Sequence, residues 1–295
     1  MRIDFSKTVE IDMRSKLYPS NWIFFSDAPE RLYAIGDTSL LSSRAFTVVG
    51  SRRITPTAAR TGEAIVKDLS RAFTIVTGTA DGGDTAAIVG ALSGSGKIIC
   101  LLAGGFSTLP QSNLSLLEQV ARRGLLLALH DYDTPVRNYS YEYRNKLLAA
   151  LGEGVLVLGA GNKSGALITA KYADKLQKPV FALPYPPLSA TGEGCNALIK
   201  RGAHLTETAQ DIFESFDDIE FSTSETPTET SRPTVSLTPD EQTVASALRA
   251  RGEAHITELV SDTRLPLFKL RAVLSALEVK RVAVGIGGNR FSSLP

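Results

Sequence analysis

The stretch Ala45–Arg60, AFTVVGSRRITPTAAR, decides the fold class of this chain. It begins with a continuous apolar run, which is typical of a strand buried on both faces. A helix-like segment opens near Thr55, and residues 50–53, Gly-Ser-Arg-Arg, lie between the two. Strand, glycine turn and helix form the first half of a β-α-β unit. The stretch therefore predicts a parallel sheet covered by helices.

The same alternation continues to about residue 216. The further strand-like runs are FTIVTG, KIICLLAGG, GLLLALH, GVLVLGAG and KPVFALP, and helix-length amphipathic segments separate them. Because apolar strands that alternate with helices need crossover connections, residues 45–216 are predicted to form a doubly wound parallel α/β sheet. We expect residues 1–44 to be a lead-in that packs on this core.

The composition changes after the α/β segment. Residues 217–236 are acidic, rich in Ser, Thr and Pro and poor in large apolar residues, which predicts a flexible linker. Residues 237–295 read as three helices followed by a hairpin around Gly-Gly-Asn, the outline of a small winged-helix domain. Thr238 and Asp240 are placed to cap the first of these helices.

Bulk properties exclude several classes of protein. The net charge is +1, so binding to nucleic acid needs a local basic patch. The two cysteines, Cys100 and Cys195, lie far apart and outside any metal-ligand spacing, which disfavours a disulfide scaffold and structural zinc. A charged N-terminus and short apolar runs predict a cytoplasmic protein with no membrane segment. No cofactor and no metal are predicted.

Glycines cluster where the predicted strands end. They lie in residues 50–53, 77–84, 103–105 and 159–165. Ligands of open parallel sheets bind beyond these strand ends, and glycine loops at helix N-termini favour anions. The segments therefore predict a phosphate-binding rim. The dinucleotide fingerprint and the Walker spacing are both absent from the sequence, which disfavours NAD binding and ATP hydrolysis.

Catalytic patterns are weak. Asp81 and Asp84 could act as acid and base, but aspartates in such a turn more often cap the following helix. The three histidines are scattered, Cys195 suits a half-buried core position, and Ser51 and Ser164 lack a nucleophile elbow. The sequence therefore favours a binding protein over an enzyme.

Basic residues concentrate in or near the strand-end loops, namely Arg52, Arg53, Arg144, Lys146, Lys163 and Lys200. Spread over several loops, they would follow a phosphodiester backbone. Tyr139, Tyr141 and Tyr143 either stack bases or pack at a helix entry.

An ordered set of motifs resembles the DNA-processing protein family DprA, also called Smf. The matching pieces over about residues 17–215 are LYPSNWIFFSDAPERLYAIGD, VVGSRRITPTA, IVTGTADGGDTAAIVGAL, the segment from YRNKLLAALG to KPVFALP, and GEGCNALIKRGAHL. Some positions depart from the family pattern: its Ala-His pair reads Ala86-Ala87, and its Ser-Gly reads Thr77-Gly78. The helical N-terminal domain of many members is expected to be missing, so the chain is predicted to be a divergent member.

The resemblance implies an extended Rossmann-like fold that binds single-stranded DNA without sequence preference. It further implies a homodimer, assistance in loading a RecA-type recombinase during DNA uptake or recombination, and no catalysis. The motif matches and the glycine loops together predict the DNA-binding residues Gly50, Ser51, Arg52, Arg53, Gly78, Gly82, Arg144, Asn145, Lys163, Ser164, Gly165 and Thr169.

Two alternatives remain open. The same rim could serve a sensor of a small nucleotide, which the near-zero net charge favours. An enzyme of the phosphoribohydrolase group has a similar sheet, but the chain lacks that group's Pro-Gly-Gly-x-Gly-Thr-x-x-Glu stretch. For the winged helix, Lys269, Arg271 and Arg290 supply little charge, so we expect protein contacts or a modest contribution to DNA binding.

Overall fold

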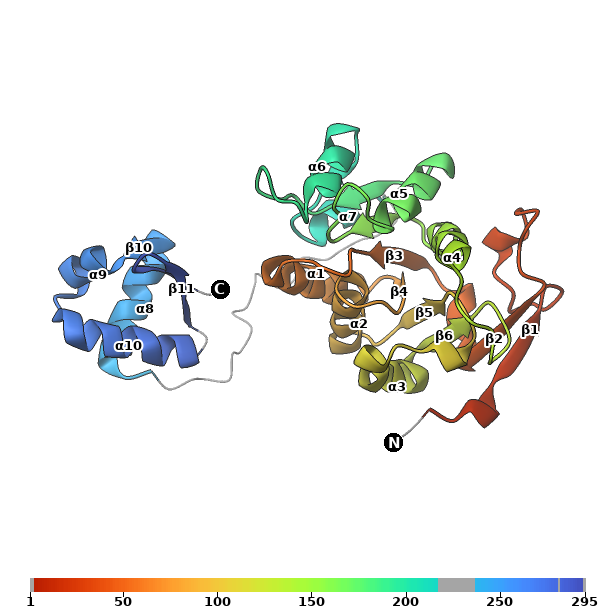
Figure 1. The fold of residues 1–295 in the computed structure, drawn as a ribbon, viewed down its shortest axis with the longest axis horizontal. Coiled ribbons are helices and arrows are strands. Elements are labelled where there is room, and N and C mark those ends of the chain that lie inside the picture. Colours follow the sequence, from red (N-terminus) through yellow and green to blue (C-terminus); the bar gives the residue numbers. More distant parts are fainter. Residues whose placement is uncertain (1–2, 217–236, 281, 294–295) are drawn as a thin grey trace. The chain divides into compact units, whose positions relative to one another are not determined.

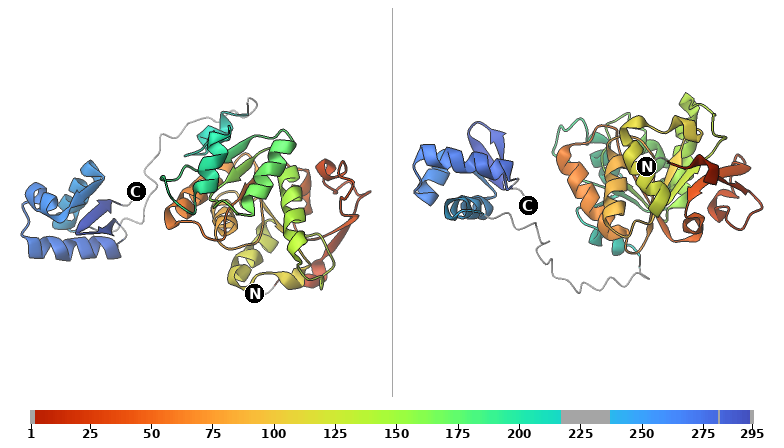
Figure 2. Two further views of the ribbon diagram at one scale, coloured as in Figure 1. Left: turned by 45° about the horizontal axis from the view of Figure 1, so that its top comes forward. Right: turned by 90° about the horizontal axis from the view of Figure 1, so that it is seen from below.

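A computed structural model describes residues 3–216, 237–280 and 282–293. The chain divides between residues 221 and 222 into two compact units, which Figures 1 and 2 display. The predicted linker 217–236 lies outside the described residues. Among the residues that the structure describes, no helix is both long and apolar enough to span a membrane.

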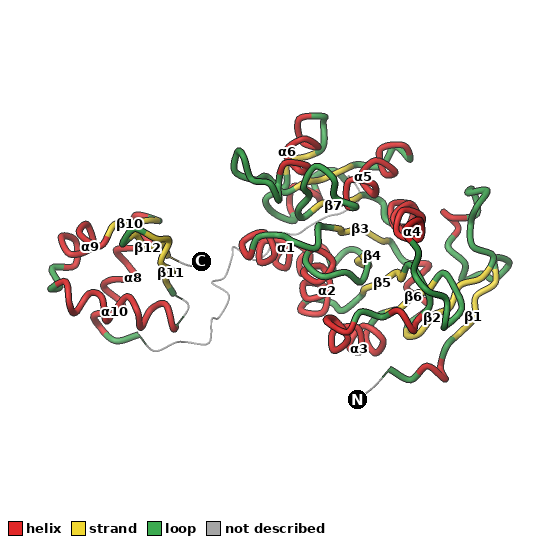
Figure 3. The backbone as a smooth tube through the Cα atoms, in the orientation of Figure 1, coloured by secondary structure: helices red, strands yellow, loops and turns green. Residues whose placement is uncertain are grey.

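Within its described residues, the first unit builds a nine-stranded sheet. The strands are β1 (Val9–Asp12), β2 (Arg31–Gly36), β3 (Ala45–Val49), β4 (Thr74–Thr77), β5 (Ile98–Leu102), β6 (Leu125–Ala128), β7 (Val155–Val157), β8 (Val180–Ala182) and β9 (His204–Leu205). The helices are α1 (Pro56–Leu69), α2 (Gly83–Ser93), α3 (Leu114–Arg123), α4 (Asn138–Leu151), α5 (Ala166–Lys175), α6 (Glu193–Lys200) and α7 (Gln210–Phe213). Helices α1, α2 and α3 cover one face of the sheet, and α4 and α5 cover the other (Figures 1 and 3).

The strand order places a topological switch point beside β3. The order is β1-β2-β6-β5-β4-β3-β7-β8-β9, and all pairs from β6 to β9 are parallel. The chain runs outward from β3 to β6 and then returns to β7 on the other side of β3, where Thr47 lies opposite both Val76 and Val155. Ligands of such sheets bind at this reversal. The predicted doubly wound α/β fold is confirmed.

The lead-in adds two antiparallel strands that the sequence analysis did not predict. β2 pairs with the edge of β6, and β1 then pairs with β2. The loop between them is anchored to α4, because the buried Trp22 indole donates a hydrogen bond to the Leu147 carbonyl at 3.1 Å. The lead-in therefore supports the helix that carries Arg144 and Asn145.

The core of the first unit follows from its apolar strands. Every residue of β3, β5 and β6 is buried. Rings of Phe46, Phe73 and Phe181 pack near the amino ends of the strands, with centroids 5.3–5.8 Å apart where Phe46 contacts the other two. Buried side chains stabilise the scaffold at one end of the sheet. The opposite, carboxyl end is free to carry polar loops.

The second unit is described by itself. Its elements are α8 (Pro239–Arg251), β10 (Glu253–His255), α9 (Ile256–Thr263), α10 (Leu267–Val279), β11 (Ala283–Gly287) and β12 (Arg290–Ser293), with sheet order β10-β12-β11. Thr238 caps α8 in a capping box with Glu241, whereas Asp240 pairs with Lys269 at 2.6 Å. The described residues of this unit thus form three helices and a hairpin, together with the short β10. Its assignment as a winged helix stays a prediction.

Candidate nucleic-acid interface

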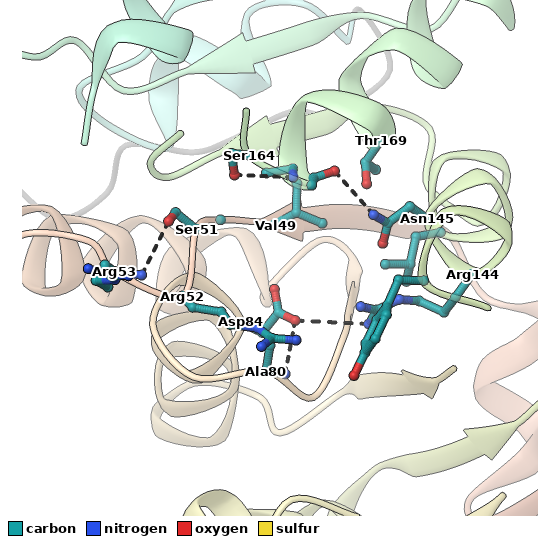
Figure 4. Close-up of a pocket in the computed structure, with 15 residues that line it drawn as sticks. Val49, Ser51, Arg52, Arg53, Ala80, Asp84, Arg144, Asn145, Ser164 and Thr169 are labelled. Carbon is teal, nitrogen blue, oxygen red and sulfur yellow. Dashed lines mark hydrogen bonds and ion pairs between the residues drawn. The ribbon is translucent and has the colours of Figure 1, made fainter. Parts of the chain in front are cut away.

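A pocket of about 430 Å³ opens at the switch point between β3 and β7. Its walls come from the loop after β3, the start of α2, α4 and the start of α5 (Figure 4). Of the twelve predicted residues, those that line it are Gly50, Ser51, Arg52, Arg53, Arg144, Asn145, Ser164, Gly165 and Thr169. Segments far apart in the sequence therefore meet here, because parallel strands bring their carboxyl ends to one edge of the sheet.

The loop after β3 is held by backbone contacts on both sides. The Ser51 N–H donates to the Gly159 carbonyl at 2.7 Å, and the Ser51 carbonyl accepts from the Gly83 N–H at 3.0 Å. A Cβ on Gly50 would lie 2.8 Å from the Gly83 Cα. Gly82 has φ +79°, and a Cβ there would overlap the Ser51 carbonyl oxygen. Gly82 lies outside the lining and instead shapes this loop from behind.

A buried ion pair forms the floor of the pocket. Nη1 of Arg144 lies 4.0 Å from Oδ2 of Asp84, and their side chains are only 8% and 7% exposed. The same Nη1 donates to the Leu101 carbonyl at 3.2 Å, and the Asp84 carboxylate accepts from the Ala80 N–H at 3.1 Å. Figure 4 shows the two side chains pointing toward one another.

Burial shifts both members of this pair toward their neutral forms. It raises the pKa of Asp84, opposed by the charge of Arg144 and by backbone N–H groups. It lowers the pKa of the Arg144 guanidinium, opposed by the charge of Asp84. Each charge therefore depends on the other to remain ionised. The expectation that Asp84 caps α2 is wrong, because the helix is capped by Gly82 and Asp84 turns to Arg144.

Gly78 lies behind this pair. A Cβ at Gly78 would overlap both the Arg144 guanidinium and the Asp84 carboxylate, so only glycine leaves room for the ion pair. Nε of Arg144 and the hydroxyl of Thr77, the residue before Gly78, are buried without a hydrogen-bond partner among the described residues. Polar atoms in that state are costly and are often satisfied by a ligand or by water.

The opposite wall is the N-terminal end of α5. Asn145 donates from Nδ2 to the Gly165 carbonyl at 3.1 Å, and Ser164 Oγ accepts from the Ala166 N–H at 3.3 Å. The hydroxyl of Thr169 lines the pocket and has no partner among the described residues. A helix N-terminus and an unpaired hydroxyl suit an anion with several oxygen atoms.

Arg52 and Tyr141 separate the pocket from a second one. The Arg52 guanidinium carbon lies 5.6 Å from the Tyr141 ring centroid, within cation–π range. The second pocket, of about 230 Å³, shares Arg52, Ala80, Tyr141 and Arg144 with the first, and its other walls come from the ends of β4 and β5. The two pockets thus form one groove. The sequence reasoning left the role of Tyr141 open and gave Ala80 no role.

Several predicted residues point elsewhere. Lys163 lies on the loop before α5 and Lys200 at the end of α6, and both are outside the lining of either pocket. Lys146 pairs with Asp27 in the lead-in, and the Tyr143 hydroxyl donates to the Asp27 carbonyl. Both therefore support the lead-in rather than the groove. Among the residues that the structure describes, no group of His, Cys, Asp and Glu could hold a metal ion.

Three guanidinium groups, from Arg52, Arg53 and Arg144, line the groove. The carboxylates in its lining are those of Asp84 in the first pocket and Asp81 in the second. Hydroxyls and glycine backbone complete its walls. Fold and groove together define a Rossmann-like α/β protein with an arginine-lined pocket at the switch point of its sheet.

Comparison with known proteins identifies the family. Residues 10–217 match the family described as DNA recombination-mediator protein A, and the chain belongs to this family. It is 32% identical to the DNA processing protein DprA of Streptococcus pneumoniae over 72% of this chain and 76% of that protein. It is 34% identical to the DprA of Bacillus subtilis, covering 70% and 71% of the two chains. The resemblance predicted from the motifs is confirmed.

Solved structures agree with this assignment. The crystal structure of DprA from Streptococcus pneumoniae aligns with a TM-score of 0.67 at 32% identity, covering 74% of this chain and 76% of that one. DprA from Helicobacter pylori, solved to show its single-stranded DNA binding mode, aligns with a TM-score of 0.65 at 29% identity, covering 73% and 97%. The chain is thus a member of a family of DNA-processing proteins.

Proposed function

We propose that this protein binds single-stranded DNA without sequence preference in the groove between β3 and β7. One observation carries the proposal: three arginines and the N-terminal end of α5 converge on a pocket whose backbone is exposed at glycines. Such groups recognise backbone phosphate, which carries no sequence information. The binding mode described for the Helicobacter pylori relative supports the same ligand class.

The shape of the groove favours a single strand. Tyr141 is 40% exposed and stands where the two pockets meet, so its ring can stack one base while the backbone passes the arginines. Stacking on an aromatic ring accepts any base and requires that the base be unpaired. A duplex would keep its bases away from this ring. We therefore expect a strong preference for single strands over duplex.

We further propose that the role is not catalytic. The pocket hydroxyl of Ser51 accepts a hydrogen bond from the Arg53 N–H, and the hydroxyl of Ser164 accepts one from the Ala166 N–H. Among the described residues, neither hydroxyl forms a hydrogen bond with a side-chain base. Asp84 is tied to Arg144 at the floor. A nucleophile and a general base within hydrogen-bond reach are the minimum for acyl or phosphoryl transfer through a covalent intermediate.

The proposed biological role is to help load a RecA-type recombinase onto the bound strand, with the protein acting as a homodimer in the cytoplasm. Membership in a family described as recombination mediators supports this role. The rate at which a RecA-type recombinase forms filaments on single-stranded DNA, measured with and without this protein, would test it. Faster filament formation on DNA coated with a single-strand binding protein is the expected result, and an unchanged rate would contradict it.

The DNA-binding proposal is tested by fluorescence anisotropy with a labelled oligo-dT of about 35 nucleotides at several salt concentrations. Arg52→Ala should weaken binding by roughly 10- to 100-fold, because it removes charge-assisted hydrogen bonds worth about 1.5–3 kcal/mol. The slope of log affinity against log salt should fall by about one phosphate contact.

Arg71→Ala is the matched control, because Arg71 is also exposed but precedes β4 at the opposite end of the sheet. It should bind oligo-dT like the unmodified protein. Equal losses in the two variants would refute the placement of the DNA in this groove.

A small nucleotide is the second candidate ligand. The volume of the first pocket, about 430 Å³, lies in the range of small-molecule sites, and the net charge of +1 gives no long-range attraction for a polyanion. Competition separates the two ligands. If a mononucleotide binds tightly and oligo-dT does not, the sensor replaces the DNA-binding proposal.

A further inference from the structure

A separate pocket lies at the edge of the sheet that the lead-in builds. Its volume is about 450 Å³, and it is lined by Phe5, Thr8, Tyr33, Phe106, Asp131 and Tyr132. None of these residues lines either pocket of the DNA groove. Aromatic rings provide four of the six side chains, and we call the site the aromatic pocket.

The rings of the aromatic pocket form walls and a floor. Phe5 and Tyr132 stand nearly at right angles, with an interplanar angle of 77° and centroids 5.1 Å apart. Phe106 is 2% exposed and lies 6.1 Å from Phe5, at the base of the site. Tyr132 is 45% exposed at the rim. Its ring therefore remains accessible from outside.

The loop after β6 holds Tyr132 in place. The Ser107 N–H donates to the Tyr132 carbonyl, and the Gly105 N–H donates to the Thr134 carbonyl, both at 3.0 Å. A Cβ at Gly105 would overlap the carbonyl oxygens of this loop, so the loop packs closely on the segment that carries Phe106. The aromatic pocket is thus preformed by the scaffold rather than by mobile surface side chains.

The charges around the aromatic pocket are mainly negative. Asp131 is an exposed member of the lining, and its carboxylate, together with burial, raises the pKa of the neighbouring Tyr33 hydroxyl. Among the described residues, Asp131 and the neighbouring exposed Asp133 have no ion-pair partner. The other charges nearby are paired: Arg31 with Glu10 at 3.1 Å and Lys7 with Asp4 at 3.8 Å.

Aromatic faces carry the negative end of a quadrupole, and a carboxylate at the rim adds a full negative charge. Both attract a cation and repel a phosphate. The aromatic pocket is therefore opposite in character to the DNA groove, and a DNA strand is excluded as its ligand by charge.

We propose that the aromatic pocket binds an arginine side chain presented by a partner protein. A planar guanidinium can stack on the exposed Tyr132 ring while it donates hydrogen bonds to the Asp131 carboxylate. A lysine ammonium offers no planar face to stack and is more strongly hydrated, so it fits this site less well. This inference does not depend on the ligand of the DNA groove.

The probe is N-acetylarginine methylamide, and its matched control is the citrulline analogue, which keeps the planar shape and loses the charge. The full chain, labelled with 3-fluorotyrosine, is titrated with each and followed by ¹⁹F NMR. Signals of Tyr33 and Tyr132 are assigned from the variants Tyr33→Phe and Tyr132→Phe. We expect both signals to shift with millimolar arginine probe, and citrulline to bind at least tenfold more weakly.

Three variants test the lining. Tyr132→Leu should weaken binding of the arginine probe about tenfold, and Asp131→Asn several-fold with a smaller salt dependence. Phe24→Leu, which changes an exposed aromatic residue outside the aromatic pocket, should leave it unchanged. The affinity for oligo-dT should be the same in all three variants. A failure of the arginine-binding proposal can therefore be distinguished from a failure of the DNA-binding proposal.

Four results would overturn the inference. The first is the absence of any signal shift at tens of millimolar arginine probe. The second and third are binding of the citrulline analogue, or of N-acetyllysine methylamide, as tight as that of the arginine probe. The fourth is a Tyr132→Leu variant that binds the arginine probe as tightly as the unmodified protein. Far-UV circular dichroism of each variant establishes that it is folded.

Discussion

The buried ion pair of Asp84 and Arg144 offers the sharpest test of how the DNA groove is built. We consider Asp84→Asn, which keeps the shape of the side chain and an oxygen to accept the Ala80 N–H but removes the charge. The Arg144 guanidinium, with its side chain only 8% exposed, would then lie buried without a counter-charge. Breaking a buried pair in this way costs about 3–5 kcal/mol of unfolding free energy.

Urea denaturation followed by tryptophan fluorescence measures the unfolding of the first compact unit, which contains this ion pair. The chain has a single tryptophan, the fully buried Trp22, which packs against α4 in the first unit. With a urea m value of about 2–3 kcal/mol/M, the expected loss shifts the midpoint by roughly 1–2.5 M.

A double substitution supplies the control. Asp84→Leu with Arg144→Met replaces both charges by apolar groups of similar volume, and we expect it to recover most of the lost stability. Its affinity for oligo-dT should stay low, because the guanidinium at the pocket floor is gone. A cost below about 1 kcal/mol for Asp84→Asn would refute the reasoning, since the pair would then be well solvated. A double variant no more stable than Asp84→Asn would refute it as well.

Gly82→Ala places a Cβ against the Ser51 carbonyl at φ +79° and should lower the free energy of unfolding by about 1–3 kcal/mol in urea denaturation. The affinity of this variant for oligo-dT should also fall. An unchanged stability together with an unchanged affinity would show that the loop relaxes freely. Lys178 donates from Nζ to the carbonyls of Ala150 in the last turn of α4 and of Gly152 just after it, both at 2.6 Å, so Lys178→Met should cost roughly 1.5–3 kcal/mol. Burial lowers the pKa of Lys178 from 10.5 to about 8. Between these two pH values the unfolded chain binds more protons at this group than the folded chain does. Lys178 therefore increases the free energy of unfolding as pH rises through this range. Denaturation of the Lys178→Met variant should lack that rise, and a rise equal to that of the parent would contradict the assignment. Deleting residues 237–295 should change oligo-dT affinity by less than tenfold in the anisotropy assay, and a larger loss would place DNA contacts in the second unit.

The local pattern of apolar runs and glycines in the sequence was enough to predict the strands from β3 to β8 and the loops that follow them. A strand buried on both faces needs a continuous apolar run, and the run in Ala45–Val49 is fully buried as predicted. Because parallel strands align their carboxyl ends, the glycine and arginine loops had to gather at one edge. Nine of the twelve predicted site residues, Arg52 and Asn145 among them, line one pocket for this reason.

The sequence pattern could not predict where a side chain points or which residue it contacts. Lys163 follows β7 in sequence but lies outside the lining, because a loop position does not fix where a side chain points. Asp84 does not cap α2 as expected, and its carboxylate instead pairs with Arg144, which is sixty positions away in the sequence. Strands β1 and β2 were also missed, since short half-exposed strands gain most of their stability from the sheet edge that they join.

The sequence by itself determined the class of fold, the order of its elements, the family and the set of loops that gather at the switch point. The fold class, the element order and the loops follow from hydrophobic periodicity and turn chemistry, which act between near neighbours. The family follows from the resemblance of the ordered motifs. Tertiary structure alone decided the Asp84–Arg144 pair, the Arg52–Tyr141 contact that divides the groove, and the aromatic pocket on the lead-in edge. Each of these depends on burial and on distances between residues remote in the chain. Such distances are set only when the sheet closes and the helices pack on it.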